Sequence, residues 1–107
     1  MTKFTLPDLV AIVHARAVSG DSGSYTAGLL AKGPARVAKK FGEEAVELVI
    51  AAVEGDPSAL TAEAADMLYH FVVLLEARGI ALDAVMAELA GRTGRTGLEE
   101  KASRSPG

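Results

Sequence analysis

Two pairs of carboxylates are the residues of this chain whose types and spacing could do chemistry. The first pair is Glu44 and Glu47, and the second is Glu63 and Asp66. Both pairs are spaced i, i+3, and because successive helical residues turn by about 100°, the members of each pair share one helix face. A short break at residues 55–57 separates the two stretches. It predicts two antiparallel helices with all four acids converging between them.

Carboxylates gathered at one point repel one another, and each buried ion costs several kcal/mol unless it is neutralised. One or two Mg²⁺ or Mn²⁺ ions would bring a charge of +2 or +4 against the formal −4 of the four acids. Apolar and alanine residues surround both pairs and leave little room for a wide polar face. We therefore predict an oxygen-ligand metal site formed by the four acids. The alternative is a solvated acidic face.

Basic residues lie before the first acidic pair and near the end of the chain. Lys40 precedes Glu44 by one helical turn, so an i, i+4 ion pair accounts for its position. The functional alternative is that these cations hold the phosphates of a substrate whose other oxygens bind the metal, with the final segment closing over it. The candidate phosphate-binding residues are Lys32, Lys39, Lys40, Arg95, Lys101 and Arg104.

His70 is the histidine whose position carries an argument for function. It follows Glu63 by seven residues, which returns it to within about 20° of the direction of that residue on a helix. We interpret it as a histidine at the edge of the core, bonded to a neighbour. The functional alternative is that it orients a carboxylate or a bound phosphate. Tyr69 is expected to pack, and His14 carries no argument for function.

Helical spacing of apolar residues, with clear start and stop signals, predicts an all-α fold. Only 5% of the residues are aromatic while half are hydrophobic, which favours closely packed helices over a sheet-rich fold. The predicted helices cover residues 6–18, 25–31, 34–54, 57–78 and 80–92. The third of these is the longest, and we expect it to carry a broad apolar face formed by Val37, Ala38, Phe41, Ala45, Leu48, Val49 and Ala52. We predict a four to five helix bundle over residues 1–92, followed by a basic, mobile tail over residues 93–107.

Composition and charge limit the class of protein. The 107 residues include no cysteine, which excludes disulfides and thiolate zinc sites. A net charge of −3 gives no basic footprint for nucleic acid, and the amino terminus does not resemble a signal peptide. The longest apolar runs are too short to span a bilayer. We expect a soluble cytoplasmic protein without nucleic-acid or membrane partners, and its small size favours a homodimer.

Several segments resemble the phosphoribosyl-ATP pyrophosphohydrolase family of histidine biosynthesis. They are Ser24-Tyr25-Thr26, Lys32-Gly33-Pro34, the run from Ala38 to Glu47, the run from Glu63 to His70, and the run from Gly97 to Arg104. The resemblance covers nearly the whole chain from Ser24 onward. The acidic core alone is similar to the wider MazG-like group of all-α nucleotide pyrophosphohydrolases. The Ser-Tyr-Thr segment and the final run favour the histidine enzyme, although Gly28 stands where a larger residue is expected.

The resemblance implies hydrolysis of 1-(5-phosphoribosyl)-ATP to 1-(5-phosphoribosyl)-AMP and pyrophosphate, the second step of histidine biosynthesis, in a helical bundle completed by dimerisation. A Mg²⁺ ion, or Mn²⁺, held by the acids would neutralise the triphosphate, and the basic residues would stabilise the leaving pyrophosphate. Glu47 and Glu44 are the candidate catalytic residues, and spacing alone does not decide which acid takes the water proton. Two rivals stay open: a housekeeping (d)NTP pyrophosphatase and a non-catalytic helical interaction module.

Overall fold

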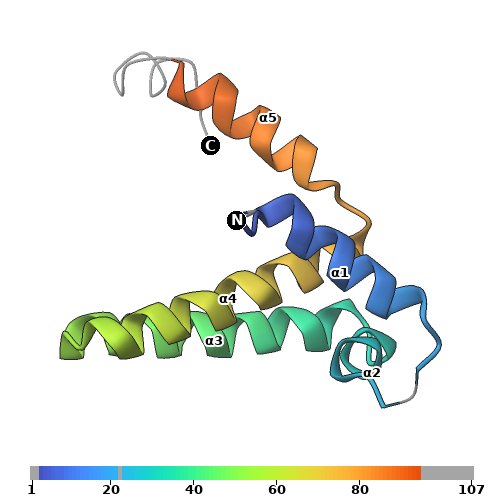
Figure 1. The fold of residues 1–107 in the computed structure, drawn as a ribbon, viewed down its shortest axis with the longest axis horizontal. Helices are drawn as coiled ribbons and strands as arrows, with labels where there is room; N and C mark the ends of the chain where they lie inside the picture. Colours follow the sequence, from blue (N-terminus) through green and yellow to red (C-terminus); the bar gives the residue numbers. More distant parts are fainter. Residues whose placement is uncertain (1–2, 22, 95–107) are drawn as a thin grey trace.

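The structure, a computed structural model, describes residues 3–21 and 23–94, and within these ranges it contains helices and no strand. The helices are α1 (Leu6–Val18), α2 (Tyr25–Ala31), α3 (Pro34–Glu54), α4 (Pro57–Arg78) and α5 (Leu82–Thr93). The two longest, α3 and α4, form an antiparallel hairpin, and α1 and α2 pack on one end of it (Figure 1). The predicted all-α fold is confirmed.

The tight turn between α3 and α4 follows from three consecutive residues. Gly55 ends α3 with a φ of 85°, a left-handed conformation that glycine adopts without the steric cost of a Cβ. The side chain of Asp56 then accepts a hydrogen bond from the backbone N–H of Ser58, and Pro57 occupies the first turn of α4. The break therefore reverses the chain, as the sequence predicts, and places the two acidic stretches side by side.

The boundary before α5 differs from the prediction by two residues. Gly79 ends α4 in the left-handed conformation, with a φ of 66°. The backbone N–H of Ile80 then donates to the carbonyl of Leu75, so Ile80 closes the end of α4 instead of opening the next helix. As a result α5 begins at Leu82, and the predicted start at residue 80 is wrong.

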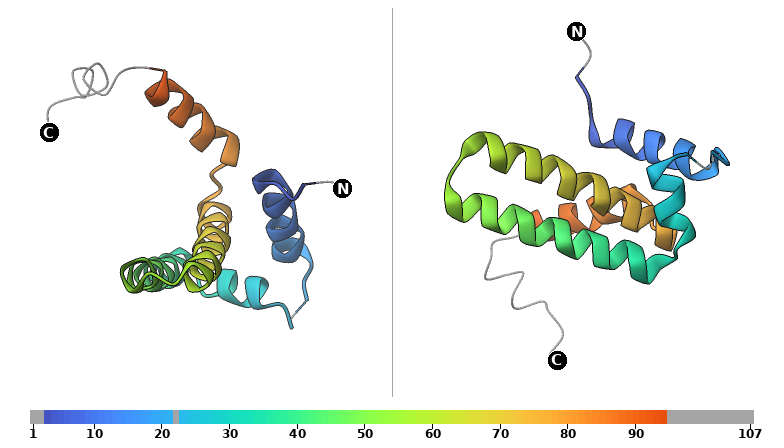
Figure 2. Two further views of the ribbon diagram at one scale, coloured as in Figure 1. Left: turned by 60° about the vertical axis from the view of Figure 1, so that its left-hand side comes forward. Right: turned by 90° about the horizontal axis from the view of Figure 1, so that it is seen from below.

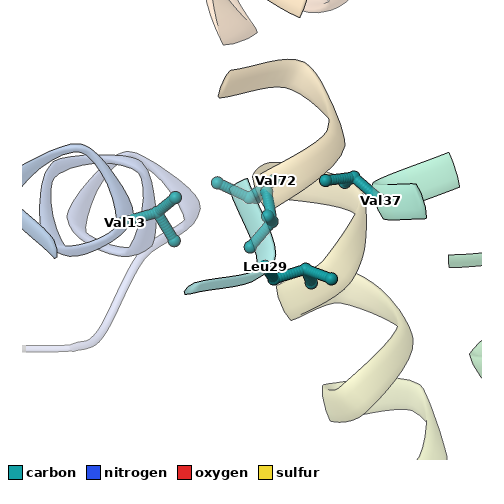
Figure 3. Packing of buried hydrophobic residues seen from close by; sticks show 5 residues of the cluster. Val13, Leu29, Val37 and Val72 are labelled. Atoms are coloured by element: carbon teal, nitrogen blue, oxygen red, sulfur yellow. The ribbon is translucent and has the colours of Figure 1, made fainter. Parts of the chain in front are cut away.

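The hydrophobic core lies at the end of the hairpin that carries α1 and α2. Figure 3 shows its residues pointing toward one another from α1, α2, α3 and α4. The buried members of this cluster are Val13, Leu29, Val37, Val72 and Val73. Because β-branched valines and one leucine fill the core, each has few rotamers to lose on burial. The core fixes α1 and α2 against the carboxy-terminal half of α4.

The outer part of α3 is apolar but not covered. Val46, Val49, Ile50 and Val53 recur at i, i+3, i+4 and i+7, so they form one stripe, which we name the α3 apolar strip. Their exposed fractions are 58%, 60%, 50% and 82%. Val49, which the sequence assigns to a broad apolar face, is therefore uncovered in the single chain. The reason is that the turn end of the hairpin projects beyond α1 and α2, as Figure 2 shows from two directions.

The shape of the single chain is open for its length. Its radius of gyration is 16.4 Å, whereas a compact domain of about 100 residues has about 13 Å. Figure 2 shows why, since α5 projects away from the other helices.

By length and composition alone α4 could cross a membrane, a test that the central helix of a soluble protein also passes. Here α4 contacts α1, α2 and α3.

Candidate functional site

Three carboxylates meet between the two arms of the hairpin. Glu44 of α3 and Glu63 and Asp66 of α4 each offer one oxygen, and these oxygens all lie within 4.8 Å of one another. We name these three residues the acid cluster. Glu44 is only 6% exposed, Glu63 is partly buried and Asp66 is exposed. The cluster is therefore open on the side of Asp66 and closed on the side of Glu44.

One oxygen of the acid cluster has no bonding partner within the described residues. Oε2 of Glu63 is buried and makes no hydrogen bond there. An unsatisfied buried carboxylate oxygen is costly, and two further carboxylates beside it add repulsion. A donor set of carboxylate oxygens alone suits a hard divalent cation such as Mg²⁺ or Mn²⁺. The residues present therefore fit a metal ion of this class, and the orphan oxygen is the observation that supports the fit.

Glu47 lies at the edge of the acid cluster. It follows Glu44 by three residues on α3, but its side chain is exposed and it is not one of the three acids that meet within 4.8 Å. The negative charge of Glu44 raises the pKa of Glu47, and the charge of Glu63 adds to the effect. A carboxylate with a raised pKa is a better proton acceptor than an ordinary one. The position of Glu47 therefore suits a base beside the cluster.

Lys40 partly neutralises the buried member of the cluster. Its Nζ lies 3.2 Å from Oε1 of Glu44, so the i, i+4 ion pair that the sequence predicts is present. The hydrogen bond to Glu44 raises the pKa of Lys40, which keeps this amine charged. One cation against three carboxylates leaves the cluster with a net negative charge.

A basic pocket lies beside Lys40. Its volume is 250 Å³, and it is lined by Lys32, Arg36, Lys39, Lys40, Glu43, Tyr25 and Leu29. The structure thus brings together the three lysines that the sequence marks as phosphate-binding candidates. It adds Arg36, which sequence reasoning missed although it lies one turn before Lys40. The other three candidates, Arg95, Lys101 and Arg104, lie outside the described residues.

A larger pocket, which we name the polar pocket, opens on the other side of Tyr25. It has a volume of 590 Å³ and lies between α1, α2 and α4. Its lining residues are Ala15, Arg16, Ser19, Asp21, Ser24, Tyr25, Thr26, Asp66, Tyr69 and His70. Asp66 belongs both to this lining and to the acid cluster, so the polar pocket begins where the candidate metal site ends.

His70 links α2 to the backbone beside the acid cluster. Its Nδ1 lies 2.7 Å from the carbonyl oxygen of Asp66, which can only accept, so Nδ1 carries a proton. In the neutral ring Nε2 then accepts from the hydroxyl of Tyr25 at 2.9 Å. Burial raises the pKa of Tyr25, which keeps this hydroxyl protonated. His70 is 7% exposed and bonded to neighbours, as the structural interpretation of the sequence expects.

A second set of hydrogen bonds joins α1, α2 and α4 at the polar pocket. Nη1 of Arg16 donates to the hydroxyl of Tyr69 at 2.8 Å, and that hydroxyl also bonds to Oγ1 of Thr26. Thr26 is 1% exposed, so this network is anchored in the interior. Sequence reasoning missed Arg16 and Thr26 and assigned Tyr69 to packing. The Ser-Tyr-Thr segment was the available signal, because both α2 residues that bond to α4 belong to it.

His14 makes a separate contact away from the acid cluster. Its Nδ1 lies 2.7 Å from Oε1 of Glu76, so it connects α1 to α4. This role is structural and agrees with the absence of a functional argument for His14 in the sequence.

Comparison with known proteins identifies the family. The family model described as "Phosphoribosyl-ATP pyrophosphohydrolase" matches residues 6–93. A "Phosphoribosyl-ATP pyrophosphatase" of Methylobacterium radiotolerans is 60% identical over 99% of each chain. Proteins named "Phosphoribosyl-ATP pyrophosphatase 1" from Rhodopseudomonas palustris and Bradyrhizobium diazoefficiens are each 62% identical, over 97% of this chain and 97% and 98% of their own lengths. With a match that spans all five helices, the chain belongs to the phosphoribosyl-ATP pyrophosphohydrolase family.

Proposed function

We propose that this protein hydrolyses 1-(5-phosphoribosyl)-ATP to 1-(5-phosphoribosyl)-AMP and pyrophosphate, the second step of histidine biosynthesis. The observation that carries the proposal is the acid cluster with its buried, unpartnered Glu63 oxygen, next to a pocket lined by four cations. Cleavage of a phosphoanhydride requires neutralisation of the triphosphate, alignment of a water molecule and stabilisation of the leaving pyrophosphate. The acid cluster can hold a cation that neutralises the triphosphate, and the basic pocket can stabilise the leaving pyrophosphate.

The ion proposed for the acid cluster is Mg²⁺, with Mn²⁺ as a substitute. Glu44, Glu63 and Asp66 would hold it, and Glu47 is close enough along α3 to complete the set or to act beside it. When bound, such an ion supplies charge neutralisation for the triphosphate and acidifies a coordinated water. The oxygen donor set and the orphan Glu63 oxygen support this assignment.

The side chains of the protein have separate roles in this reaction. Glu47 takes a proton from the attacking water, because its exposed carboxylate lies beside the acid cluster without being one of its three members. The water oxygen forms a bond to phosphorus while the bond between phosphorus and the bridging oxygen breaks. Lys39 and Lys40 stabilise the pyrophosphate that leaves with the electrons of that bond. Lys32 and Arg36 extend the same positive lining.

Two further parts of the proposal concern the whole molecule. The α3 apolar strip, its heptad-like spacing and the open shape of the chain support a homodimer in which a second copy covers the strip. The protein is proposed to be cytoplasmic and to act without membrane or nucleic-acid partners. The basic residues of the final segment, Arg95, Lys101 and Arg104, stay predicted as a clamp on the substrate.

The proposal is tested by a substrate panel with identification of the products. The purified chain is incubated with Mg²⁺ and phosphoribosyl-ATP, ATP or each canonical dNTP, and the products are followed by ³¹P NMR. We expect pyrophosphate and phosphoribosyl-AMP in equal amounts, with kcat/KM highest for phosphoribosyl-ATP. A preference for a dNTP would identify a housekeeping pyrophosphatase. Absence of turnover with every nucleotide would favour a non-catalytic interaction module.

A further inference from the structure

We propose that the polar pocket is the subsite for the 5-phosphoribosyl group of the substrate, and that Arg16 selects for that group by contacting its phosphate. The inference rests on the proposed function. It assigns to Arg16 the discrimination between phosphoribosyl-ATP and ATP, which differ only in this group. The residues that carry the argument are those of the polar pocket outside the acid cluster.

The charges of the two pockets decide which end of the substrate each one accepts. The basic pocket has four cations against the single carboxylate of Glu43. The polar pocket has one cation, Arg16, against the carboxylates of Asp21 and Asp66. A triphosphate, with three linked phosphoryl groups, is therefore attracted more strongly to the first lining than to the second. The triphosphate therefore extends from the acid cluster toward the basic pocket, and the remainder of the substrate extends into the polar pocket.

The composition of the polar pocket matches a sugar phosphate. A single phosphate monoester carries a charge of about −1.5 to −2 at neutral pH, which one arginine can bind through two parallel hydrogen bonds. Carboxylate and hydroxyl groups in the same lining, from Asp21, Ser19 and Ser24, can bond to ribose hydroxyls. The volume of 590 Å³ lies in the range of about 300–1,000 Å³ that small-molecule sites occupy.

Arg16 is held in place before any ligand arrives. Its Nη1 donates to the hydroxyl of Tyr69 at 2.8 Å, and Tyr69 is bonded in turn to the buried Thr26. A guanidinium has five N–H donors, and this bond uses one of them. A side chain positioned by a buried network loses less entropy when it binds a ligand. The network thus makes Arg16 a prepared anion-binding group in a lining that contains no other cation.

The location of the polar pocket explains how Arg16 affects substrate specificity without affecting the chemical step. Asp66 separates the polar pocket from the acid cluster, so a ligand in the pocket lies next to the candidate metal site and outside it. Tyr25 lines both pockets and lies between them. A substrate that lacks the phosphoribosyl group can still place its triphosphate at the cluster and leave the polar pocket to water.

The proposal is tested with Arg16→Ala, measured against phosphoribosyl-ATP and against ATP as a competitor. We expect KM for phosphoribosyl-ATP to rise about tenfold or more, with kcat changed less than about threefold, because one charge-assisted contact is lost. The inhibition constant of ATP should stay within about twofold of the wild-type value. Equal weakening of both nucleotides, or no change for phosphoribosyl-ATP, would overturn the assignment.

Two variants control for effects on the fold. Tyr69→Phe removes the same hydrogen bond but keeps Arg16, so its KM should rise less than that of Arg16→Ala. Arg78→Ala removes an exposed arginine at the far end of α4, outside the polar pocket, and should leave both nucleotides unaffected. If Tyr69→Phe equals Arg16→Ala in effect, Arg16 acts through the packing of α1 and the proposal fails.

A binding measurement separates this inference from the proposed function. Ribose 5-phosphate is titrated into ¹⁵N-labelled wild-type protein and into Arg16→Ala. We expect amide shifts around Arg16, Thr26 and Tyr69, and a Kd at least about tenfold weaker in the variant. Equal affinity in the two proteins, or no shifts at about 10 mM ligand, would contradict the subsite whatever the turnover. Failure to hydrolyse phosphoribosyl-ATP with this binding intact would contradict only the proposed reaction.

Discussion

The acid cluster and the α3 apolar strip lie on the same hairpin and break the usual distribution of polar and apolar groups in opposite ways. In the cluster, a charged glutamate is 6% exposed, and a carboxylate oxygen of its neighbour is buried without a partner. In the strip, four β-branched residues are at least 50% exposed. Each arrangement is unfavourable for an isolated chain in water. The difference between them indicates the partner that each surface requires.

A buried cluster of like charges requires an ion, whereas an exposed apolar stripe requires another apolar surface. Both surfaces depend on the same α3–α4 packing, since Gly55 and Asp56 fix the antiparallel turn that creates them. Selective changes should therefore remove the function of one region and leave the other intact.

The largest effect is expected from removing one carboxylate of the acid cluster, or the carboxylate of Glu47 beside it. Asp66→Asn and Glu47→Gln should each lower kcat for phosphoribosyl-ATP on the order of a thousandfold, because a metal ligand or the base is lost. Circular dichroism should show unchanged helix content, since neither side chain belongs to the hydrophobic core. Glu54→Gln, which removes an exposed acid near the turn, is the matched control and should keep full activity. Near-normal turnover by both variants with added Mg²⁺ would contradict the site.

The next effect concerns stability in the presence of metal. Mg²⁺ at about 100 times its Kd should stabilise the folded protein by about 2.7 kcal/mol, since an ion that binds only the folded state shifts unfolding by mass action. The thermal midpoint should therefore rise by several degrees for the wild type. Glu63→Gln should lose this increase, while the α3 apolar strip and its association are unaffected. A midpoint that is insensitive to Mg²⁺ in the wild type would indicate that the acids are only surface charge.

A charge placed in the α3 apolar strip should disrupt the proposed dimer. Val49→Glu should weaken self-association about tenfold or more, because the carboxylate would be desolvated against a second copy. Light scattering coupled to size-exclusion chromatography measures the change. Val18→Glu, at a position 68% exposed on α1, is the control and should leave the oligomeric state unchanged. A wild-type monomer at all concentrations would contradict the proposed dimer.

The smallest effect is a dependence of stability on pH without metal. Because neighbouring charges raise the pKa of Glu47, the folded state binds its proton more tightly than the unfolded state. Stability from this group is present below its ordinary pKa and is lost as the pH rises through the raised value. Glu47→Gln, which cannot ionise, should therefore unfold at a higher temperature than the wild type at about pH 7. The difference should vanish near pH 4, and a difference independent of pH would contradict it.

Most of the fold could be predicted from the sequence because local signals define the helices. The starts of α2, α3 and α4 lie where the structure has them because of local signals at Ser24, Gly33-Pro34 and Gly55-Asp56-Pro57. The start of α5 could not be placed in this way, since it depends on the bond that Ile80 makes to the end of α4. The exposure of Val49 could not be predicted either, because periodicity identifies an apolar face without showing what covers it.

The candidate site also has one part that could be predicted from the sequence and one part that could not. The i, i+3 spacing and the turn were sufficient to predict that Glu44 lies close to Glu63 and Asp66, as it does in the structure. The polar pocket was not predictable, because α1 and α2 enter it through contacts such as that of Arg16 with Tyr69, 53 residues apart in the chain. Spacing on one helix carries no information about such contacts.

The most direct test of the central claim is a titration of Mn²⁺ followed by electron paramagnetic resonance, which reports free Mn²⁺. We predict that the wild-type protein removes the signal of free Mn²⁺ with saturation at one or two ions per chain, that Mg²⁺ competes for the same sites, and that Glu63→Gln loses this binding. An undiminished signal of free Mn²⁺ with the wild-type protein, or equal binding by wild type and Glu63→Gln, would contradict the account of the acid cluster.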